Sequence, residues 1–355
     1  MSEQIRVAVV GCGIGAEHMR AYRTLPERFE LRAVCDIDLD KAREAAAMFE
    51  IPQAVADFGA LCRMADLDLI DICTPPHLHF SQIAQALAAG KHAICEKPLV
   101  GSVREVDELA EAEARSGRRM MPIFQYRFGQ GLQKLKFLVQ QGLAGRAYLS
   151  TVETAWRRRA AYYDVPWRGK WRTEMGGALL SHAIHSHDML TYIAGPIKSV
   201  FARAATLVNA IEVEDTAAAT LEMADGSLAT LAVTLGSSQE VTRHRFCFSG
   251  LAAESNTRSY SNSGDPWVFT GDTPEQAAAI ETALAGFTPL PEGFAGQFLR
   301  FADALRDGTP PPVTLADARA ALELVTALYV STRSGRPVEL PIGPDHPAYA
   351  SWLPA

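Results

Sequence analysis

Short apolar runs alternate with helical patterns over the first 125 residues of this 355-residue chain. The runs of strand length are Ile5–Val10, Leu31–Cys35, Leu69–Cys73, His92–Cys95 and Arg119–Ile123, with a weaker one at 54–55. Helical patterns cover Ala16–Leu25, Leu39–Phe49, a segment from Phe58, Phe80–Ala89 and Val103–Ser116. Strands that alternate with helices over short connections predict a parallel sheet covered on both faces, which is a doubly wound α/β domain.

The pattern changes after residue 125. A helix is expected at Leu132–Gln141, strands at 147–156, 217–223, 227–235 and 241–248, and a long helix at 315–334 capped near Thr314. Asp225 and Gly226 between two alternating strands are typical of a β-hairpin. Segment 250–295 is rich in Gly, Pro and Ser and resists assignment. The sequence therefore predicts a doubly wound α/β domain over 1–125, followed over 126–355 by an α+β domain with a largely antiparallel open sheet.

Composition narrows the class of protein. The chain is 48% hydrophobic and 21% charged, which is ordinary for a globular protein of about two domains. Its formal net charge of −7 disfavours nucleic acid or an anionic membrane as partner. No apolar run approaches the roughly 20 residues of a membrane span, and no signal-peptide core precedes the first strand, so we expect a cytoplasmic protein. The six cysteines form no Cys-x-x-Cys pair and are expected to be reduced thiols.

A glycine cluster follows the first strand and opens the first helix. Gly11 permits the tight turn, and Gly13 allows the backbone to approach a pyrophosphate. Small residues at Gly15 and Ala16 allow close packing between helix and strand, and the helix N-terminus offers unpaired N–H groups. The strand before and the helix after make this a dinucleotide site.

Asp36 stands at the end of the second strand. A carboxylate there accepts hydrogen bonds from the adenosine ribose hydroxyls and repels a 2′-phosphate. We therefore expect NAD, with NADP the less favoured cofactor. The alternative is an ordinary turn aspartate, since Asp38 is close by.

Several motifs resemble the glucose-fructose oxidoreductase, inositol dehydrogenase and rhizopine-catabolism (Gfo/Idh/MocA) family. The resemblance runs through both halves of the chain and lies in Thr74–His79, Ala89–His92, Glu96–Pro98, Gln125–Arg127, Gly176–Leu179 with His185 and Asp188, Asp317–Arg319 and Val338–Pro341. It implies a Rossmann domain, a sheet domain that often makes the oligomer contact, and NAD(P)-dependent oxidation or reduction of sugar or polyol hydroxyls.

The resemblance also implies site residues, of which Lys97 and His185 are the catalytic pair. Cofactor contacts are expected from Gly11, Gly13, Ile14, Gly15, Ala16, Asp36, Thr74, Pro75, His79, Glu96, Lys97, Gln125, Trp167 and Arg168. Substrate contacts are expected from Lys97, Arg127, Tyr163, Trp171, Ser181, His182 and His185.

The residue chemistry points the same way. An ammonium beside oxidised nicotinamide meets a like charge, which lowers its pKa and suits Lys97 to hold the substrate oxygen. An imidazole with an ordinary pKa of about 6.5 suits His185 as the general base. Tyr162, Tyr163, Trp167, Arg168 and Trp171 form an aromatic and cationic loop that suits the apolar face and hydroxyls of a sugar.

Helical spacing predicts that Ser181, His185 and Asp188 share one face, with Asp188 able to orient His185. Many family members carry Asp where this chain has Ser181, so His182 is a candidate to supply some of that hydrogen bonding or to contact a sugar hydroxyl. The same spacing separates His187 from His182 and His185, so we expect no metal and a structural role for His187.

Taken together, these patterns predict an NAD-dependent dehydrogenase that oxidises a secondary hydroxyl of a sugar, glycoside or cyclitol to a ketone. Two alternatives stay open. One is a cofactor-binding sensor or regulator without turnover, and the other is an NADPH-dependent reductase of a cyclic diol-type substrate. The open sheet predicts a homodimer or homotetramer.

Overall fold

The computed structural model describes residues 4–354, which group into two compact units. The first unit contains the residues up to Gln125 together with Gly293–Arg319. The second unit contains Tyr126–Glu292 and the residues from Ala320 onward.

A six-stranded parallel sheet forms the centre of the first unit. Its strands lie in the order β3-β2-β1-β4-β5-β6. They are β1 (Ile5–Val10), β2 (Phe29–Cys35), β3 (Gln53–Val55), β4 (Leu69–Ile72), β5 (His92–Cys95) and β6 (Met120–Pro122). This order is that of a dinucleotide-binding Rossmann sheet, so the predicted doubly wound fold is confirmed.

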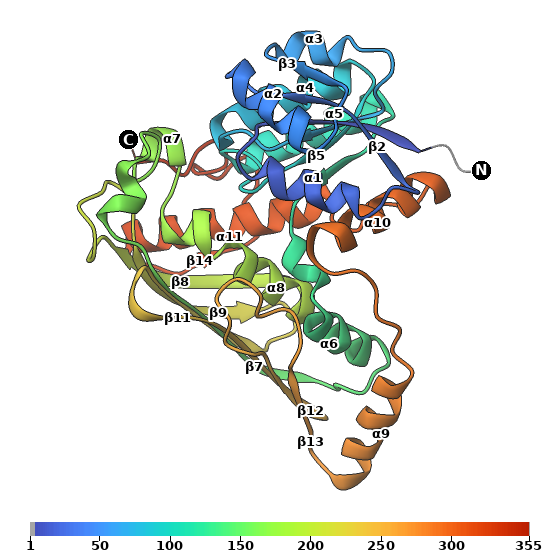
Figure 1. The fold of residues 1–355 in the computed structure, drawn as a ribbon. Helices are drawn as coiled ribbons and strands as arrows, with labels where there is room; N and C mark the ends of the chain where they lie inside the picture. Colours follow the sequence, from blue (N-terminus) through green and yellow to red (C-terminus); the bar gives the residue numbers. More distant parts are fainter. Residues whose placement is uncertain (1–3, 355) are drawn as a thin grey trace. The chain divides into compact units, whose positions relative to one another are not determined.

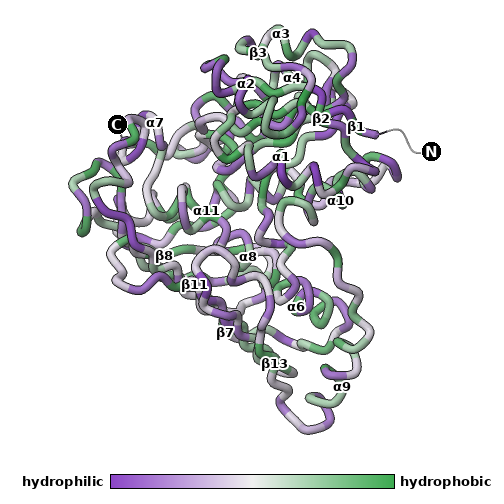
Figure 2. Tube along the Cα trace, viewed as in Figure 1, coloured by the Kyte–Doolittle hydropathy of each residue, from purple (hydrophilic) through white to green (hydrophobic). Residues whose placement is uncertain are grey.

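Helices cover both faces of this sheet (Figure 1). They are α1 (Gly15–Arg23), α2 (Leu39–Met48), α3 (Phe58–Cys62), η1 (Pro76–Leu78), α4 (His79–Ala88) and α5 (Val103–Ser116). Strand residues buried on both faces account for the continuous apolar runs, since Val7, Ala8 and Val9 are all fully buried. Figure 2 shows the hydrophobic stretches that run through this unit. Side-chain caps start the helices, as Asp38 accepts hydrogen bonds at α2 and Ser102 at α5.

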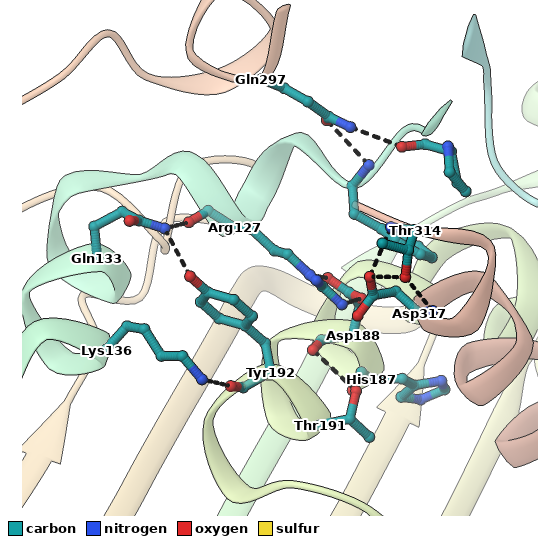
Figure 3. Close-up of polar contacts among 12 residues, drawn as sticks. Arg127, Gln133, Lys136, His187, Asp188, Thr191, Tyr192, Gln297, Thr314 and Asp317 are labelled. Atoms are coloured by element: carbon teal, nitrogen blue, oxygen red, sulfur yellow. Dashed lines mark hydrogen bonds and ion pairs between the residues drawn. The ribbon is translucent and has the colours of Figure 1, made fainter. Parts of the chain in front are cut away.

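Helix α10 (Gly293–Asp307) groups with the first compact unit although it comes late in the chain. Its Phe298 is fully buried, and the ring stacks on Tyr22 of α1 with centroids 4.3 Å apart. The Gln297 side chain accepts from the Phe124 N–H and donates to the Pro122 carbonyl (Figure 3). The partners of α10 lie far earlier in the chain, so no local pattern assigns this helix to the first unit.

An eight-stranded sheet forms the second unit, in the order β13-β12-β11-β7-β10-β9-β8-β14. Its strands are β7 (Ala147–Arg157), β8 (Ile197–Ala205), β9 (Thr216–Met223), β10 (Leu228–Thr234), β11 (Gly236–Phe248), β12 (Leu251–Glu254), β13 (Val268–Gly271) and β14 (Val338–Glu339). Only β7 and β10 pair in parallel among these described strands. The predicted largely antiparallel sheet is confirmed.

One face of this sheet is covered by helices. The helical segments that follow β6, apart from α10, are η2 (Gln125–Phe128), α6 (Gln130–Gln140), η3 (Ala160–Asp164), α7 (Trp171–Glu174), η4 (Ala178–His182), α8 (Ile184–Ala194), α9 (Pro274–Ala285) and α11 (Leu315–Ser334). Helix α8 packs on β7 and β11. There the Ser186 hydroxyl lies 2.9 Å from that of Thr154, and its carbonyl lies 3.1 Å from His244 Nε2.

The other face of the sheet is open within the chain. On β10, Ala229, Leu231 and Val233 are buried, whereas Leu228 on the opposite side is 55% exposed. This alternation matches the pattern of a sheet with one covered face. Thr314 and Asp317 cap α11 reciprocally, as the predicted cap near Thr314 requires.

Two further observations concern the described residues. None of their helices is both long and apolar enough to cross a membrane. All six cysteines are free, as expected from their spacing.

Candidate active site

The turn after β1 is built around Gly11. Its φ is +95°, and its N–H donates to the Cys35 carbonyl at 2.7 Å. A Cβ at this position would lie 2.6 Å from the carbonyl oxygen of Cys73, which follows β4. Only glycine meets both demands, so the close approach of the β1 and β4 ends requires the first glycine of the predicted loop.

The next residues leave an open cradle above the start of α1. A Cβ built at Gly13 would meet no heavy atom of the described chain within 4 Å. A Cβ at Gly15 would lie 3.0 Å from Val9 Cγ1, so this glycine serves helix–strand packing. Ile14 is the residue before the helix and is 44% exposed. Ala16 lies in the first turn of the helix, where its N–H donates to the Gly13 carbonyl at 3.2 Å. The empty space at Gly13 and the helix N-terminus fit a pyrophosphate.

Asp36 connects the end of β2 to the glycine loop. Its carboxylate accepts hydrogen bonds from the Cys12 N–H at 2.9 Å and from the Asp38 N–H at 3.0 Å. The side chain is half-buried, and the neighbouring cation Lys41 lies 3.5 Å from Asp38. A fixed carboxylate beside the loop fits ribose hydroxyls and opposes a 2′-phosphate.

The loops after β4 and β5 are joined by His79. Its Nε2 lies 2.7 Å from the Thr74 carbonyl oxygen and its Nδ1 lies 3.0 Å from that of Pro98. Thr74 and Pro75 end one loop, and Pro98 follows Lys97 in the other. His79 is fully buried and contacts both loops, so it connects them inside the unit.

Glu96 and Lys97 follow β5 at the same edge of the sheet. One Glu96 oxygen accepts the backbone N–H of Lys97 at 2.9 Å, and the other lies 3.0 Å from Nε2 of His18 on α1. Lys97 is half-buried. At the end of the first unit, the amide oxygen of Gln125 is buried and has no hydrogen-bond partner among the described residues. Such an orphaned acceptor is suited to a bound molecule.

The segment that carries the histidines is not one regular helix. Ala178–His182 forms a π-helix and α8 begins only at Ile184. Ser181 donates its N–H to the Gly177 carbonyl at 2.8 Å. The wider π-turn breaks the spacing of 3.6 residues per turn between Ser181 and His185, whereas His185 and Asp188 stay three residues apart on α8.

Asp188 pairs with Arg127 in the second unit (Figure 3). Nε and Nη2 of Arg127 donate to the two carboxylate oxygens at 2.7 and 2.5 Å, and both side chains are buried. The guanidinium also lies 4.8 Å from the Tyr192 ring centroid. This bidentate pair anchors α8 through Asp188.

His185 and His187 lie in different surroundings. His185 is 5% exposed, and its ring stacks on that of Tyr126 with centroids 4.3 Å apart. Burial lowers the pKa of His187 to about 3, and neither of its ring nitrogens has a hydrogen-bond partner in the part of the chain that the structure describes. His187 is therefore a neutral imidazole inside the unit.

An aromatic and cationic cluster lies around His182. Its ring lies against Trp156 and Tyr162, each with a centroid distance of 5.6 Å. The Arg168 guanidinium lies over the rings of Tyr162 and Trp167, at 4.0 and 4.4 Å. The structure thus brings together most of the predicted loop.

The two remaining loop residues lie at its edges. Tyr163 stands edge-on to Tyr162 at 5.1 Å. Trp171 packs its ring against Tyr329 at 5.2 Å.

Glu214 anchors the turn before the π-helix and was missed by sequence reasoning. Its carboxylate accepts the N–H groups of Leu179 at 2.9 Å and Gly177 at 3.1 Å, and the hydroxyl of Tyr329 at 3.0 Å. A Cβ at Gly177 would lie 1.8 Å from the Glu214 carbonyl oxygen. Burial raises the pKa of Glu214 to about 7, although these hydrogen bonds act to lower it.

Comparison with known proteins establishes the class. Residues 5–124 match the oxidoreductase family with the NAD-binding Rossmann fold, and residues 132–252 match the Gfo/Idh/MocA C-terminal domain. The chain belongs to the Gfo/Idh/MocA family of oxidoreductases, and its first unit carries the NAD-binding domain. The predictions of family, enzyme class and NAD as cofactor are confirmed.

Three relatives show the range of the likeness. The chain is 25% identical to D-glucoside 3-dehydrogenase of Escherichia coli, over 96% of this chain and 98% of that one. It is 26% identical to myo-inositol 2-dehydrogenase of Thermotoga maritima, over 95% and 98%. The crystal structure of the WlbA dehydrogenase from Bordetella pertussis, in complex with NADH and UDP-GlcNAcA, is 28% identical with a TM-score of 0.84, over 96% of this chain and 100% of that one.

We predict that Gly13→Ala weakens NAD+ binding at least tenfold while leaving stability unchanged within about 0.5 kcal/mol. The added methyl group meets open space in the protein but fills the cradle. Isothermal titration and urea unfolding measure the two quantities. Gly11→Ala is the matched contrast, since it must lower stability; unaltered NAD+ affinity in Gly13→Ala would contradict the assignment of the cradle.

The raised pKa of Glu214 predicts a pH-dependent stability. Because the folded protein holds this proton more tightly than the unfolded chain, the group's contribution is complete below pH 4.5 and is lost as pH rises through about 7. The loss amounts to roughly 3 kcal/mol over that range. Urea unfolding at pH 5 and pH 8 should show this loss in the free energy of unfolding of the wild type and not in that of Glu214→Gln. Parallel pH dependences would contradict it.

Proposed function

We propose that this protein is an NAD-dependent dehydrogenase that oxidises a secondary hydroxyl of a sugar, glycoside or cyclitol to a ketone. The observation that carries the proposal is the aromatic and cationic cluster of His182, Tyr162 and Arg168, in the same unit as His185. Aromatic faces and fixed donors suit the alternating apolar and hydroxyl surfaces of a sugar ring. Relatives named for glucoside and inositol oxidation support this substrate class.

We assign the proton chemistry to His185. In the reaction the hydroxyl loses its proton and the carbinol carbon loses a hydride, and bound NAD+ supplies the hydride acceptor. His185 takes the proton, and its ring is held in one plane by stacking on Tyr126. A buried imidazole fixed in this way loses little entropy when it meets the substrate.

Lys97 stabilises the oxygen that becomes alkoxide-like as the hydride leaves. Its backbone is fixed by the Glu96 carboxylate. Cofactor contacts are assigned to the glycine loop, Asp36 and the loops that His79 joins, with Gln125, Trp167 and Arg168 as further candidates. Tyr163, Trp171, Ser181 and His182 are assigned to the substrate. Arg127 stays a candidate for the substrate as well, with its Nε and Nη2 engaged by Asp188.

The fixed carboxylate of Asp36 supports NAD over NADP, which also disfavours the NADPH-dependent reductase. A sensor without turnover needs neither Lys97 nor His185. Formation of NADH in the presence of a substrate distinguishes the dehydrogenase from the sensor.

We predict that the protein with NAD+ and a panel of sugars, glycosides and cyclitols produces NADH, followed by its absorbance. Lys97→Met and His185→Asn should each lower kcat by about 10²–10⁴-fold, since each removes a group that acts on the reacting oxygen, with NAD+ affinity retained. Lys198→Met, at an exposed lysine of β8, is the matched control.

Full activity in both variants would overturn these roles. NAD+ binding without turnover on the whole panel would favour the sensor.

The open face of the second sheet supports a homodimer or homotetramer. Leu149, Leu228 and Phe201 are exposed on this face, where Leu149 and Leu228 are paired in register. We predict that sedimentation velocity finds a dimer or tetramer, and that Leu228→Glu shifts it toward monomer because a charge would be buried in the contact. Met48→Glu, at an exposed position on α2, is the control. A monomeric wild type would contradict the proposal.

A further inference from the structure

A buried polar cluster in the first unit has no part in the chemistry described so far. His18 on α1 is fully buried between two carboxylates from different loops and strands. Its Nδ1 lies 2.8 Å from Oδ2 of Asp71 on β4, and its Nε2 lies 3.0 Å from Oε1 of Glu96. The Tyr22 hydroxyl donates to the same Asp71 oxygen at 3.0 Å.

The geometry makes His18 a double donor. An ionised carboxylate accepts hydrogen bonds only, so a ring nitrogen facing each carboxylate must carry a proton. Burial lowers the pKa of His18, but the charges and hydrogen bonds of Asp71 and Cys73 together raise it, so that the pKa lies well above the ordinary value. The ring is covered by Phe294 and Phe298 of α10, with centroids at 4.3 and 5.3 Å.

The bridge continues to the lysine. Glu96 uses one oxygen for His18 and the other for the backbone N–H of Lys97 at 2.9 Å. These two contacts, one to each oxygen, set the orientation of the carboxylate. Removal of the imidazolium would take away the charged hydrogen bond to Oε1, so the side chain would be held less tightly against the backbone of Lys97.

We propose that His18 is a positioning residue for Lys97, acting through the Glu96 carboxylate. The proposal rests on the role given to Lys97 under the proposed function. His18 fixes the backbone from which the ammonium extends, and Asp71 holds the other side of the ring. A misplacement of about 1 Å at a reacting group can cost about a hundredfold in rate, so such a support affects turnover more than binding.

Two substitutions of His18 distinguish the contact of Nε2 with Glu96 from the contact of Nδ1 with Asp71. The amide nitrogen of Gln reaches the place of Nε2 and can still donate to Glu96, whereas Asn reaches only the place of Nδ1, toward Asp71. We expect His18→Gln to keep kcat within about threefold of the wild type and His18→Asn to lower it at least tenfold, with KM for NAD+ changed less than about threefold in both. A merely structural role would lower stability in both variants without this difference in kcat. Equal kcat in the two folded variants would overturn the proposal.

A double variant tests the route through Glu96. His18→Asn combined with Glu96→Ala should lower kcat no further than Glu96→Ala alone, because both changes remove the same support. Additive losses would overturn it. Should His18→Asn fail to fold, ¹⁵N NMR of the histidine-labelled wild type decides. Protons on both His18 nitrogens at pH 7.5 support the bridge, and an unprotonated Nε2 overturns it.

Two controls make the outcome specific. If the wild type forms no NADH with any member of the panel, the proposed function has failed, and if Lys97→Met keeps the wild-type kcat, the role of Lys97 has failed. If Lys97→Met is inactive while His18→Asn is not, only the bridge has failed. The side chains of His18, Asp71 and Cys73 offer ligand atoms within 4.8 Å of one another. Metal analysis of the purified protein must therefore find no stoichiometric ion, since a bound metal would replace the imidazolium bridge.

Discussion

The close approach between the turn after β1 and the end of β4 is the constraint on which the cofactor site depends. Gly11 tolerates it only because the residue has no Cβ, which would lie 2.6 Å from the Cys73 carbonyl oxygen. Strands β1 and β4 are neighbours whose following segments lead to opposite sides of the sheet order, so their carboxyl ends open a crevice there. Asp36 follows β2 and Lys97 follows β5, the two strands that flank the β1–β4 pair, so both stand at the same edge of the sheet. The contact between Gly11 and the Cys73 carbonyl thus sets the shape of the sheet edge at which the glycine loop, Asp36 and Lys97 stand.

The two units hold their functional segments with buried charge in different ways. In the first unit, the imidazole of His18 lies between the carboxylates of Asp71 and Glu96, so a positive charge stands between two negative ones. In the second, Arg127 and Asp188 form a bidentate pair, whereas Glu214 is held by N–H and O–H donors alone. That difference explains why burial raises the pKa of Glu214 to about 7. The π-helix that leads to His185 is accordingly tied to a group that titrates near neutral pH.

Local patterns predicted those parts of the fold whose cause is local. Strand β1 and helix α11 have their expected bounds, because an apolar run and a capped amphipathic segment are complete signals in themselves. Strands β12 and β13 were not assigned, since four-residue strands are defined by their pairing rather than by their composition. The glycine loop was found from the strand before it and the helix after it, whereas the Glu96–Pro98 motif was found through its resemblance to the family. The support from His18, by contrast, depends on partners 53 and 78 residues away, which no spacing rule reveals.

The central claim is that a hydride passes directly from a substrate carbon to the cofactor held by the first unit. The most direct measurement uses a sugar or cyclitol deuterated at the carbinol carbon, together with NAD+ and the wild-type protein, followed by mass spectrometry of the reduced nicotinamide. The account predicts one deuterium in each NADH formed and a slower rate than with the unlabelled substrate. Reduced cofactor without deuterium, or ketone formed without reduced cofactor, would contradict it.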